Sequence, residues 1–124
     1  MANRPILLIE DNEQNRYLVT FLLEKHGYAV VAATNGEQGI DAAQKCGPDL
    51  ILLDLQLPNM DGLAVARALR SIDILREIPI VAVTSYAMAG DREKALAAGC
   101  NGYIEKPIDP ERFVEQVVRF LRAG

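Results

Sequence analysis

The clearest pattern along this chain is a series of short apolar runs that stop at polar residues. Residues 5–9 and 50–53 contain no polar side chain at all. A run of this length without polar alternation is typical of a strand buried on both faces, as in a parallel sheet. Less uniform runs predict further strands at 28–33, 78–83 and 102–105.

The segment after the first run has the features of an amphipathic helix. Asn12 is a good N-cap residue, and Gly27 can end the helix in a left-handed conformation. Between them, Leu18, Phe21 and Leu22 recur at the spacing of one helical face. We therefore expect these three side chains to point into the core.

Helix signals also follow each of the later runs. Thr34 and Glu37 have the spacing of a capping box, which predicts a helix up to about residue 46. A third helix is expected at 63–71. Asp91 is the expected cap of the fourth helix, and Asp109, which a proline follows, that of the fifth. The apolar stripe of this last helix comprises Phe113, Val117, Phe120 and Leu121.

The strand and helix signals alternate strictly, which is the pattern of an α/β protein with one parallel sheet and helices on both faces. Right-handed crossovers between the strands restrict the topology further. The chain has 124 residues, the usual size of one domain, and contains no linker or low-complexity segment. We expect a single doubly wound α/β domain over residues 1–124, with no second domain.

Composition narrows the possible functions. The net charge is −4 and there is no run of Lys and Arg, so nucleic-acid binding has little support. No apolar run approaches the length of a membrane helix, and the first residues lack the apolar core of a signal peptide. Cys46 and Cys100 belong to no metal-binding pattern. A cytoplasmic protein with two reduced thiols is the simplest expectation.

In a parallel sheet, the carboxyl ends of all strands lie at one edge, where ligands bind in open α/β folds. The polar residues expected at that edge are Glu10, Asp11, Asp54, Thr84 and Lys106. Each of them alone also fits an ordinary role, such as a helix-start acid, a turn residue or a solvated charge. Their convergence on one crevice is what favours a functional site.

Three carboxylates in one crevice need a proton or a cation to compensate their charge. Because no His or Cys is expected nearby, the oxygen ligands favour a hard ion such as Mg²⁺, which keeps open positions for water and phosphate. Lys106 and the Thr84 hydroxyl would offer a cation and a donor to a phosphoryl group. Asp54, at the end of the central run, is then a candidate nucleophile that forms an aspartyl phosphate.

These residues and their surroundings resemble the receiver domain of two-component response regulators over essentially the whole chain. The resemblance is carried by Glu10-Asp11 after the first strand, Asp54 within Asp-Leu-Gln-Leu-Pro-Asn-Met-Asp-Gly, Thr84, and Lys106-Pro107. The one departure in the acidic pair is Glu10, where aspartate is also common. The resemblance implies a flavodoxin-like (βα)5 fold with strand order 2-1-3-4-5, and a signalling switch rather than an enzyme.

The resemblance also implies a role for each site residue. Asp54 would accept a phosphoryl group from a phosphohistidine on a sensor histidine kinase or a histidine phosphotransfer protein. Asp11, Asp54 and the backbone carbonyl of Gln56 would bind Mg²⁺, with Glu10 assisting through water. Gln56 and Tyr86 flank the pocket and are expected to tune the rate of phosphoryl hydrolysis.

Other implied roles concern the response to phosphorylation. Thr84 and Lys106 would contact the phosphoryl oxygens, and the Lys106–Pro107 bond is cis in the family. Tyr103 matches the family's switch aromatic, which moves inward as Thr84 moves toward the phosphate. From its position alone, a half-buried aromatic of an edge strand fits Tyr103 equally well. The segment 84–88 resembles single-domain regulators of cell-cycle or developmental pathways. The implied output surface is formed by the fourth helix, fifth strand and fifth helix, near Met88, Tyr103 and Arg119.

Other classes of protein share parts of this pattern. A phosphatase of the haloacid dehalogenase type also forms an aspartyl phosphate, but needs a second acid two residues after the nucleophile, where this chain has Gln56. A flavodoxin-like cofactor binder needs a phosphate loop rich in Ser, Thr and Gly, whereas the acidic residues at 10–13 would repel a phosphate. A binding module that ignores phosphate is a further alternative, which a phosphate-transfer assay distinguishes.

Overall fold

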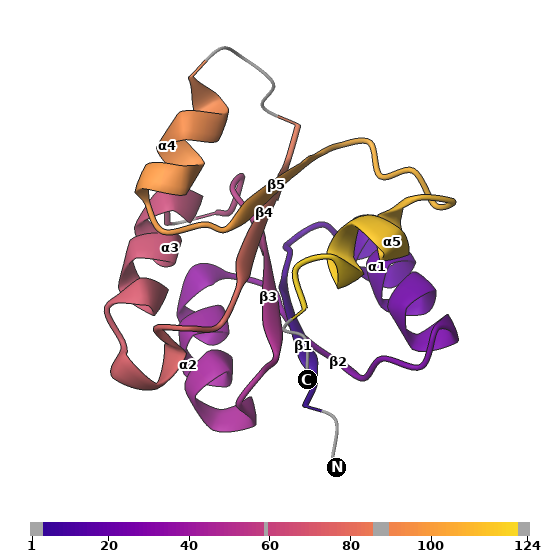
Figure 1. Cartoon of the computed structure of the whole chain (residues 1–124), viewed down its shortest axis with the longest axis horizontal. Helices are drawn as coiled ribbons and strands as arrows, with labels where there is room; N and C mark the ends of the chain where they lie inside the picture. Colours follow the sequence, from indigo (N-terminus) through magenta and orange to yellow (C-terminus); the bar gives the residue numbers. More distant parts are fainter. Residues whose placement is uncertain (1–3, 59, 86–89, 122–124) are drawn as a thin grey trace.

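The computed structural model of the protein describes residues 4–58, 60–85 and 90–121. Its strands form one sheet in the order β2-β1-β3-β4-β5, and all neighbouring strands are parallel (Figure 1). The strands are β1 (Ile6–Ile9), β2 (Val30–Ala33), β3 (Leu50–Asp54), β4 (Ile80–Thr84) and β5 (Gly102–Glu105). The predicted fold class and strand order are confirmed.

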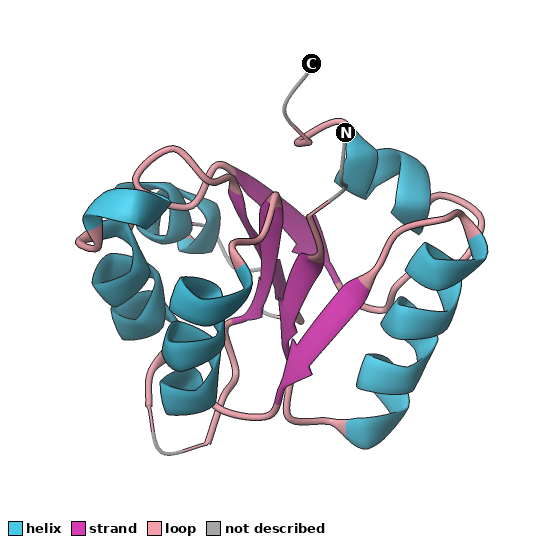
Figure 2. Ribbon diagram, turned by 90° about the horizontal axis from the view of Figure 1, so that it is seen from below, coloured by secondary structure: helices cyan, strands magenta, loops and turns pink. Residues whose placement is uncertain are grey.

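Helices connect successive strands and cover both faces of the sheet. They are α1 (Glu13–Lys25), α2 (Gly36–Cys46), α3 (Gly62–Arg70), α4 (Asp91–Ala97) and α5 (Phe113–Val118), with an unpredicted 3-10 helix η1 (Asp73–Leu75). Figure 1 shows α2, α3 and α4 on one side of the sheet and α1 and α5 on the other, and Figure 2 shows the same three layers from below. Within the described ranges, no helix has the length and apolar character needed to span a membrane.

The side chains of β3 alternate between two apolar clusters. Ile51 and Leu53 pack beneath α2, α3 and α4, whereas Leu50 and Leu52 pack beneath α1 and α5. All four side chains are fully buried. Since successive strand residues point to opposite faces, a strand covered on both sides must be apolar throughout its length. Asp54 is polar because it stands at the end of the strand, where the sheet edge opens.

The apolar face of α1 differs in part from the predicted one. Leu18 and Leu22 pack against the core as expected, and Val19 is buried beside them. The expectation for Phe21 is wrong: its side chain is 51% exposed and stacks on Tyr17, with the ring centroids 6.3 Å apart. One residue turns a helix by about 100°, so the packing of α1 against the sheet decides which apolar side chains stay outside.

Asn12 caps α1 as predicted, but the capping box of α2 lies one residue later than expected. Asn35 is the N-cap, and its side chain accepts a hydrogen bond from the Gln38 N–H at 2.9 Å. The Gln38 side chain in turn accepts one from the Thr34 N–H at 3.0 Å. This pair has the same spacing as the predicted pair, and Asn is at least as good a cap as Thr, so spacing alone does not select between them.

The caps predicted for the last two helices are also displaced. Gly90, with φ at 92°, is the N-cap of α4, and Asp91 is the first helical residue, where its negative charge suits the helix dipole. Asp109 accepts a hydrogen bond from the Glu111 N–H at 3.0 Å in a turn that precedes α5. The helix itself begins at Phe113, whose N–H donates to the Asp109 carbonyl at 2.9 Å.

Candidate functional site

The parallel register brings the predicted site residues to one edge of the sheet. Asp54 pairs with Val83 across β3 and β4, and the residues that precede Glu10 and Asp54 pair with each other across β1 and β3. Thr84 pairs with the residue before Lys106. Each of these polar residues therefore stands at, or one position past, the carboxyl end of its strand, as the sequence predicted.

An ammonium group joins two of the carboxylates. Lys106 Nζ lies 3.0 Å from Glu10 Oε1 and 3.3 Å from Asp54 Oδ2. The three side chains are largely buried, with exposed fractions of 13% for Lys106, 2% for Glu10 and 3% for Asp54. Buried charges are stable only when they are paired and hydrogen-bonded, so these contacts with Lys106 stabilise the two buried carboxylates.

Backbone N–H groups hold the second oxygen of each buried carboxylate. The Asn12 N–H donates to Glu10 Oε2 at 3.1 Å, and the Gln56 N–H donates to Asp54 Oδ1 at 2.8 Å. Each N–H belongs to the residue two positions after its acceptor, where the chain turns away from the strand. The orientation of both carboxylates is thus set by the strand-to-loop turns.

Asp11 completes an acidic cluster at the exposed rim of the site. One oxygen each from Glu10, Asp11 and Asp54 lies within 4.8 Å of the others. Burial, together with the hydrogen bond and the charge of Asp54, raises the pKa of Glu10 to about 7, although Lys106 opposes this shift. A single ammonium does not balance three ionised carboxylates, so the cluster favours either a proton or a further cation.

The donor set fits Mg²⁺. The clustered ligand atoms are all carboxylate oxygens, which hard divalent cations prefer, and no His or Cys of the described ranges joins the cluster. Glu10 and Asp54 are held by the surrounding backbone, while Asp11 stands at the solvent side where an ion could enter.

Thr84 and Tyr103 do not belong to the acidic cluster. Thr84 is fully buried, and its carbonyl accepts a hydrogen bond from the Lys106 N–H at 2.8 Å. Tyr103, half-buried on β5, packs against the apolar cluster beneath α2, α3 and α4. Burial and the nearby charges of Asp91 and Glu105 raise the pKa of Tyr103. The following turn contains a cis peptide bond between Lys106 and Pro107.

Sequence reasoning missed two contacts of the site. Arg16 Nη1 donates to the carbonyls of Glu10 and Asp11, each at 3.1 Å, and so fixes the backbone that carries both acids. Gln56 accepts hydrogen bonds from Ser85 across the mouth of the site. No local signal marks either contact, because each partner is a common polar residue in an exposed turn or helix. Tyr86 and Met88, which the sequence analysis singled out, lie outside the described residues.

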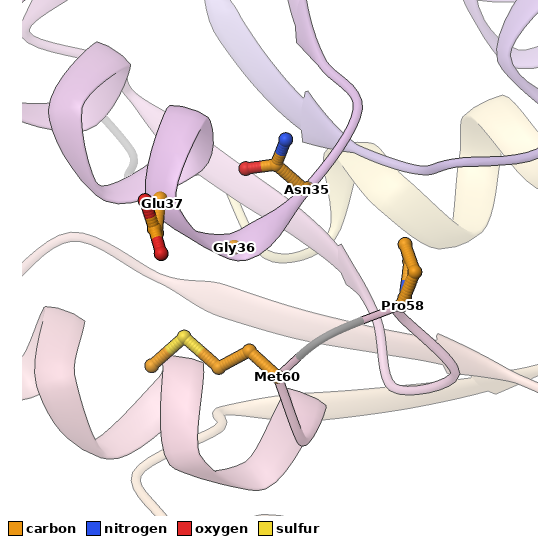
Figure 3. Close-up of a pocket in the computed structure, with 5 residues that line it drawn as sticks. All are labelled: Asn35, Gly36, Glu37, Pro58 and Met60. Carbon is orange, nitrogen blue, oxygen red and sulfur yellow. The ribbon is translucent and has the colours of Figure 1, made fainter.

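A small cavity of about 170 Å³ is formed by the start of α2 and the segment after β3 (Figure 3). Its lining residues are Asn35, Gly36, Glu37, Pro58 and Met60. None of the predicted site residues within the described ranges lines it, and the Asn35 side chain is already engaged as the cap of α2.

Comparison with known proteins identifies the family to which this chain belongs. The sequence model of the response regulator receiver domain family matches residues 6–118. The chain belongs to the response regulator receiver domain family. Receiver domains of this kind are phosphorylation-dependent switches of two-component signalling, and the acidic pocket is compatible with Mg²⁺ binding and aspartate phosphorylation.

Individual relatives agree with this assignment. The polar-differentiation response regulator DivK of Brucella anthropi is 43% identical over 118 residues, which cover 95% of this chain and 96% of the relative. Chemotaxis protein CheY4 of Vibrio cholerae has a TM-score of 0.92 at 28% identity, covering 97% of this chain and 100% of that chain. A receiver domain of a Pseudomonas aeruginosa sensor histidine kinase, solved with magnesium coordinated in its active-site cleft, has a TM-score of 0.87 at 36% identity, covering 96% and 98%.

Proposed function

We propose that Asp54 is the phosphoryl acceptor of this receiver domain. The observation that carries the proposal is its setting: a buried carboxylate at the end of the central strand, with Lys106 Nζ 3.3 Å from one oxygen and the Gln56 N–H 2.8 Å from the other. Asp11 is exposed at the rim, and burial raises the pKa of Glu10 to about 7, so near neutral pH only part of Glu10 is in the ionised form that a nucleophile needs.

The donor in this proposal is a phosphohistidine on a sensor histidine kinase or a histidine phosphotransfer protein. An oxygen of Asp54 forms a bond to phosphorus while the phosphorus–nitrogen bond breaks, and the electron pair of that bond stays on the histidine nitrogen. The ammonium of Lys106 and the hydroxyl of Thr84 contact the phosphoryl oxygens. The domain thus receives a group from its partner and releases it slowly, which is a switch function rather than the turnover of a substrate.

We propose that Asp11, Asp54 and the backbone carbonyl of Gln56 hold Mg²⁺, with Glu10 assisting through water. When bound, this ion would neutralise the acidic pocket and stabilise the negative charge of the transferring oxygens. The protein's own part is to keep the carboxylates in place through the Asn12 and Gln56 N–H groups.

The proposed response involves Thr84 and Tyr103. A phosphoryl group adds negative charge and three acceptor oxygens beside Thr84, which stands at the end of β4 and next to β5. Tyr103 on β5 is the proposed switch aromatic, and the proposed output face consists of α4, β5 and α5, including exposed Arg119. A kinase or phosphotransfer protein on the input side and a protein target on this face, all in the cytoplasm, are the proposed partners. Met88, placed on this face by the sequence analysis, lies outside the described residues.

The test is the intact mass of the protein after incubation with acetyl phosphate, with and without Mg²⁺. The wild type should gain the mass of one phosphoryl group only with Mg²⁺, and Asp54→Asn should gain none. Asp41→Asn is the matched control, because Asp41 is an exposed aspartate of α2 that pairs with Lys45. Labelling of Asp54→Asn at the wild-type level would refute the assignment. If the wild type gains no mass from acetyl phosphate or from a panel of histidine kinases, the domain is a phosphate-independent binding module.

A further inference from the structure

Gln56 joins the two segments that border the acidic pocket. Its Oε1 accepts a hydrogen bond from the Ser85 N–H at 3.3 Å and another from the Ser85 hydroxyl. Its own backbone N–H donates to Asp54 Oδ1 at 2.8 Å. One residue therefore touches both the proposed acceptor carboxylate and the chain just beyond β4.

The fold places Ser85 close to Asp54. Asp54 pairs with Val83 in neighbouring strands, which in a sheet lie about 4.8 Å apart. The Leu55 N–H donates to the Val83 carbonyl at 3.4 Å, so the segments that follow β3 and β4 remain side by side beyond the last strand pair. Ser85 follows Thr84 directly and is exposed. A phosphoryl group on Asp54 would extend from the carboxylate toward solvent, where the two Ser85 donors lie.

Resting on the proposed phosphorylation of Asp54, we infer that Gln56 is a positioning residue that competes with the phosphoryl group for the Ser85 donors. In the unphosphorylated protein, the neutral amide oxygen of Gln56 occupies the Ser85 N–H and hydroxyl. Phosphoryl oxygens are charged and accept stronger hydrogen bonds than an amide does, so they displace it. The Gln56–Ser85 contact thus opposes phosphoryl binding and favours the unphosphorylated arrangement.

The size of the effect follows from the contact that is lost. Hydrogen bonds of this kind, made at the surface between neutral groups, change an equilibrium constant about 3- to 10-fold. Gln56→Met removes the amide acceptor, keeps a side chain of similar length and leaves the backbone carbonyl in place. The Ser85 donors then face water and are available to an incoming anion.

The probe is beryllofluoride with saturating Mg²⁺, a non-covalent mimic of an aspartyl phosphate, titrated by NMR into the full chain. Gln56→Met should bind it about 3- to 10-fold more tightly than the wild type. Gln44→Met, which changes an exposed glutamine of α2, is the control and should bind as the wild type does. Ser85→Ala should weaken binding more in the Gln56→Met background than alone, because in the wild type the lost contact with the anion is partly offset by loss of the competing contact between the hydroxyl and Gln56.

Unchanged or weaker binding by Gln56→Met, with a wild type that binds the probe, overturns this inference and leaves the proposed function intact. A wild type that neither binds beryllofluoride nor gains mass from acetyl phosphate overturns both. A second readout needs no probe: loss of its acceptor should move the Ser85 amide proton upfield in Gln56→Met. An unmoved resonance means that the contact is absent in solution and also overturns the inference.

Discussion

Arg70 is predicted to contribute more to stability than any ordinary surface arginine. It lies in the last turn of α3, and its five N–H groups make six hydrogen-bond contacts, because three carbonyls share the two N–H groups of Nη1. The acceptors are the carbonyls of Leu75, Arg76, Ile78 and Gly99 and the side chain of Asn101. The guanidinium thereby ties α3 to η1, to the start of β4 and to the turn between α4 and β5. Asn101 extends the network, because its Oδ1 also accepts from the Ile80 N–H at 2.9 Å.

Arg70→Met removes the donors but keeps much of the aliphatic stem. Four of the six hydrogen bonds are partly buried, namely those to Leu75, Ile78 and, twice, Gly99. At about 0.5–1 kcal/mol each, their loss lowers the free energy of unfolding by about 2–4 kcal/mol. The exposed bonds to Arg76 and Asn101 are left out of this sum, because water replaces the donor there.

Urea unfolding followed by circular dichroism measures the change. Arg70→Met should lower the midpoint with the slope unchanged, as expected for an altered stability without an altered denatured state. Arg67→Met, an exposed position of the same helix, should lie within about 0.5 kcal/mol of the wild type. A loss below about 1 kcal/mol for Arg70→Met would show that water satisfies the carbonyls as well as the guanidinium does, and would refute the reasoning.

Three further predictions concern the site and the core. The folded state raises the pKa of Glu10 above its usual 4.5, to about 7, so this carboxyl costs stability above pH 7 and less as the pH falls toward 4.5. Glu10→Gln should therefore stabilise the metal-free protein at pH 8 in urea titrations, and the gain should vanish by pH 4.5. Gly62→Ala should cost about 1–3 kcal/mol in the same assay, since a Cβ there would overlap the Leu55 backbone. A colorimetric thiol assay at pH 8 should detect Cys46 in the native protein, and Cys100 only in urea, because burial raises the pKa of Cys100 to about 11.

The architecture could be read from the sequence because its signals are local and agree with one another. Unbroken apolar runs such as 50–53 have the pattern of a strand covered on both faces, and the alternation of strand and helix leaves few topologies. Once the sheet is parallel, the residues that follow each run must meet at one edge. Glu10, Asp11, Asp54 and Lys106 could therefore be brought together without coordinates.

Local sequence signals could not select between two neighbouring residues that are equally suited to the same position. Thr34 and Asn35 are both good caps, and only the packed start of α2 selects Asn35. Phe21 has the right spacing for the core face of α1, yet contact with the sheet turns that face toward Val19 and Leu22. In both cases the prediction chose a residue close to the correct one, and only tertiary packing distinguishes the two.

The sequence by itself determined the class of fold, the edge that carries the chemistry and the residue types at that edge. Only the tertiary structure decided which atoms meet there: Lys106 Nζ between Glu10 and Asp54, and Gln56 against Ser85. Gln56 and Ser85 are 29 residues apart in the chain, as are Arg70 and Gly99. The spacing of apolar residues and the identity of helix caps depend on residues that are close together along the chain. The pairing of polar side chains depends instead on neighbours that folding brings from elsewhere in the sequence.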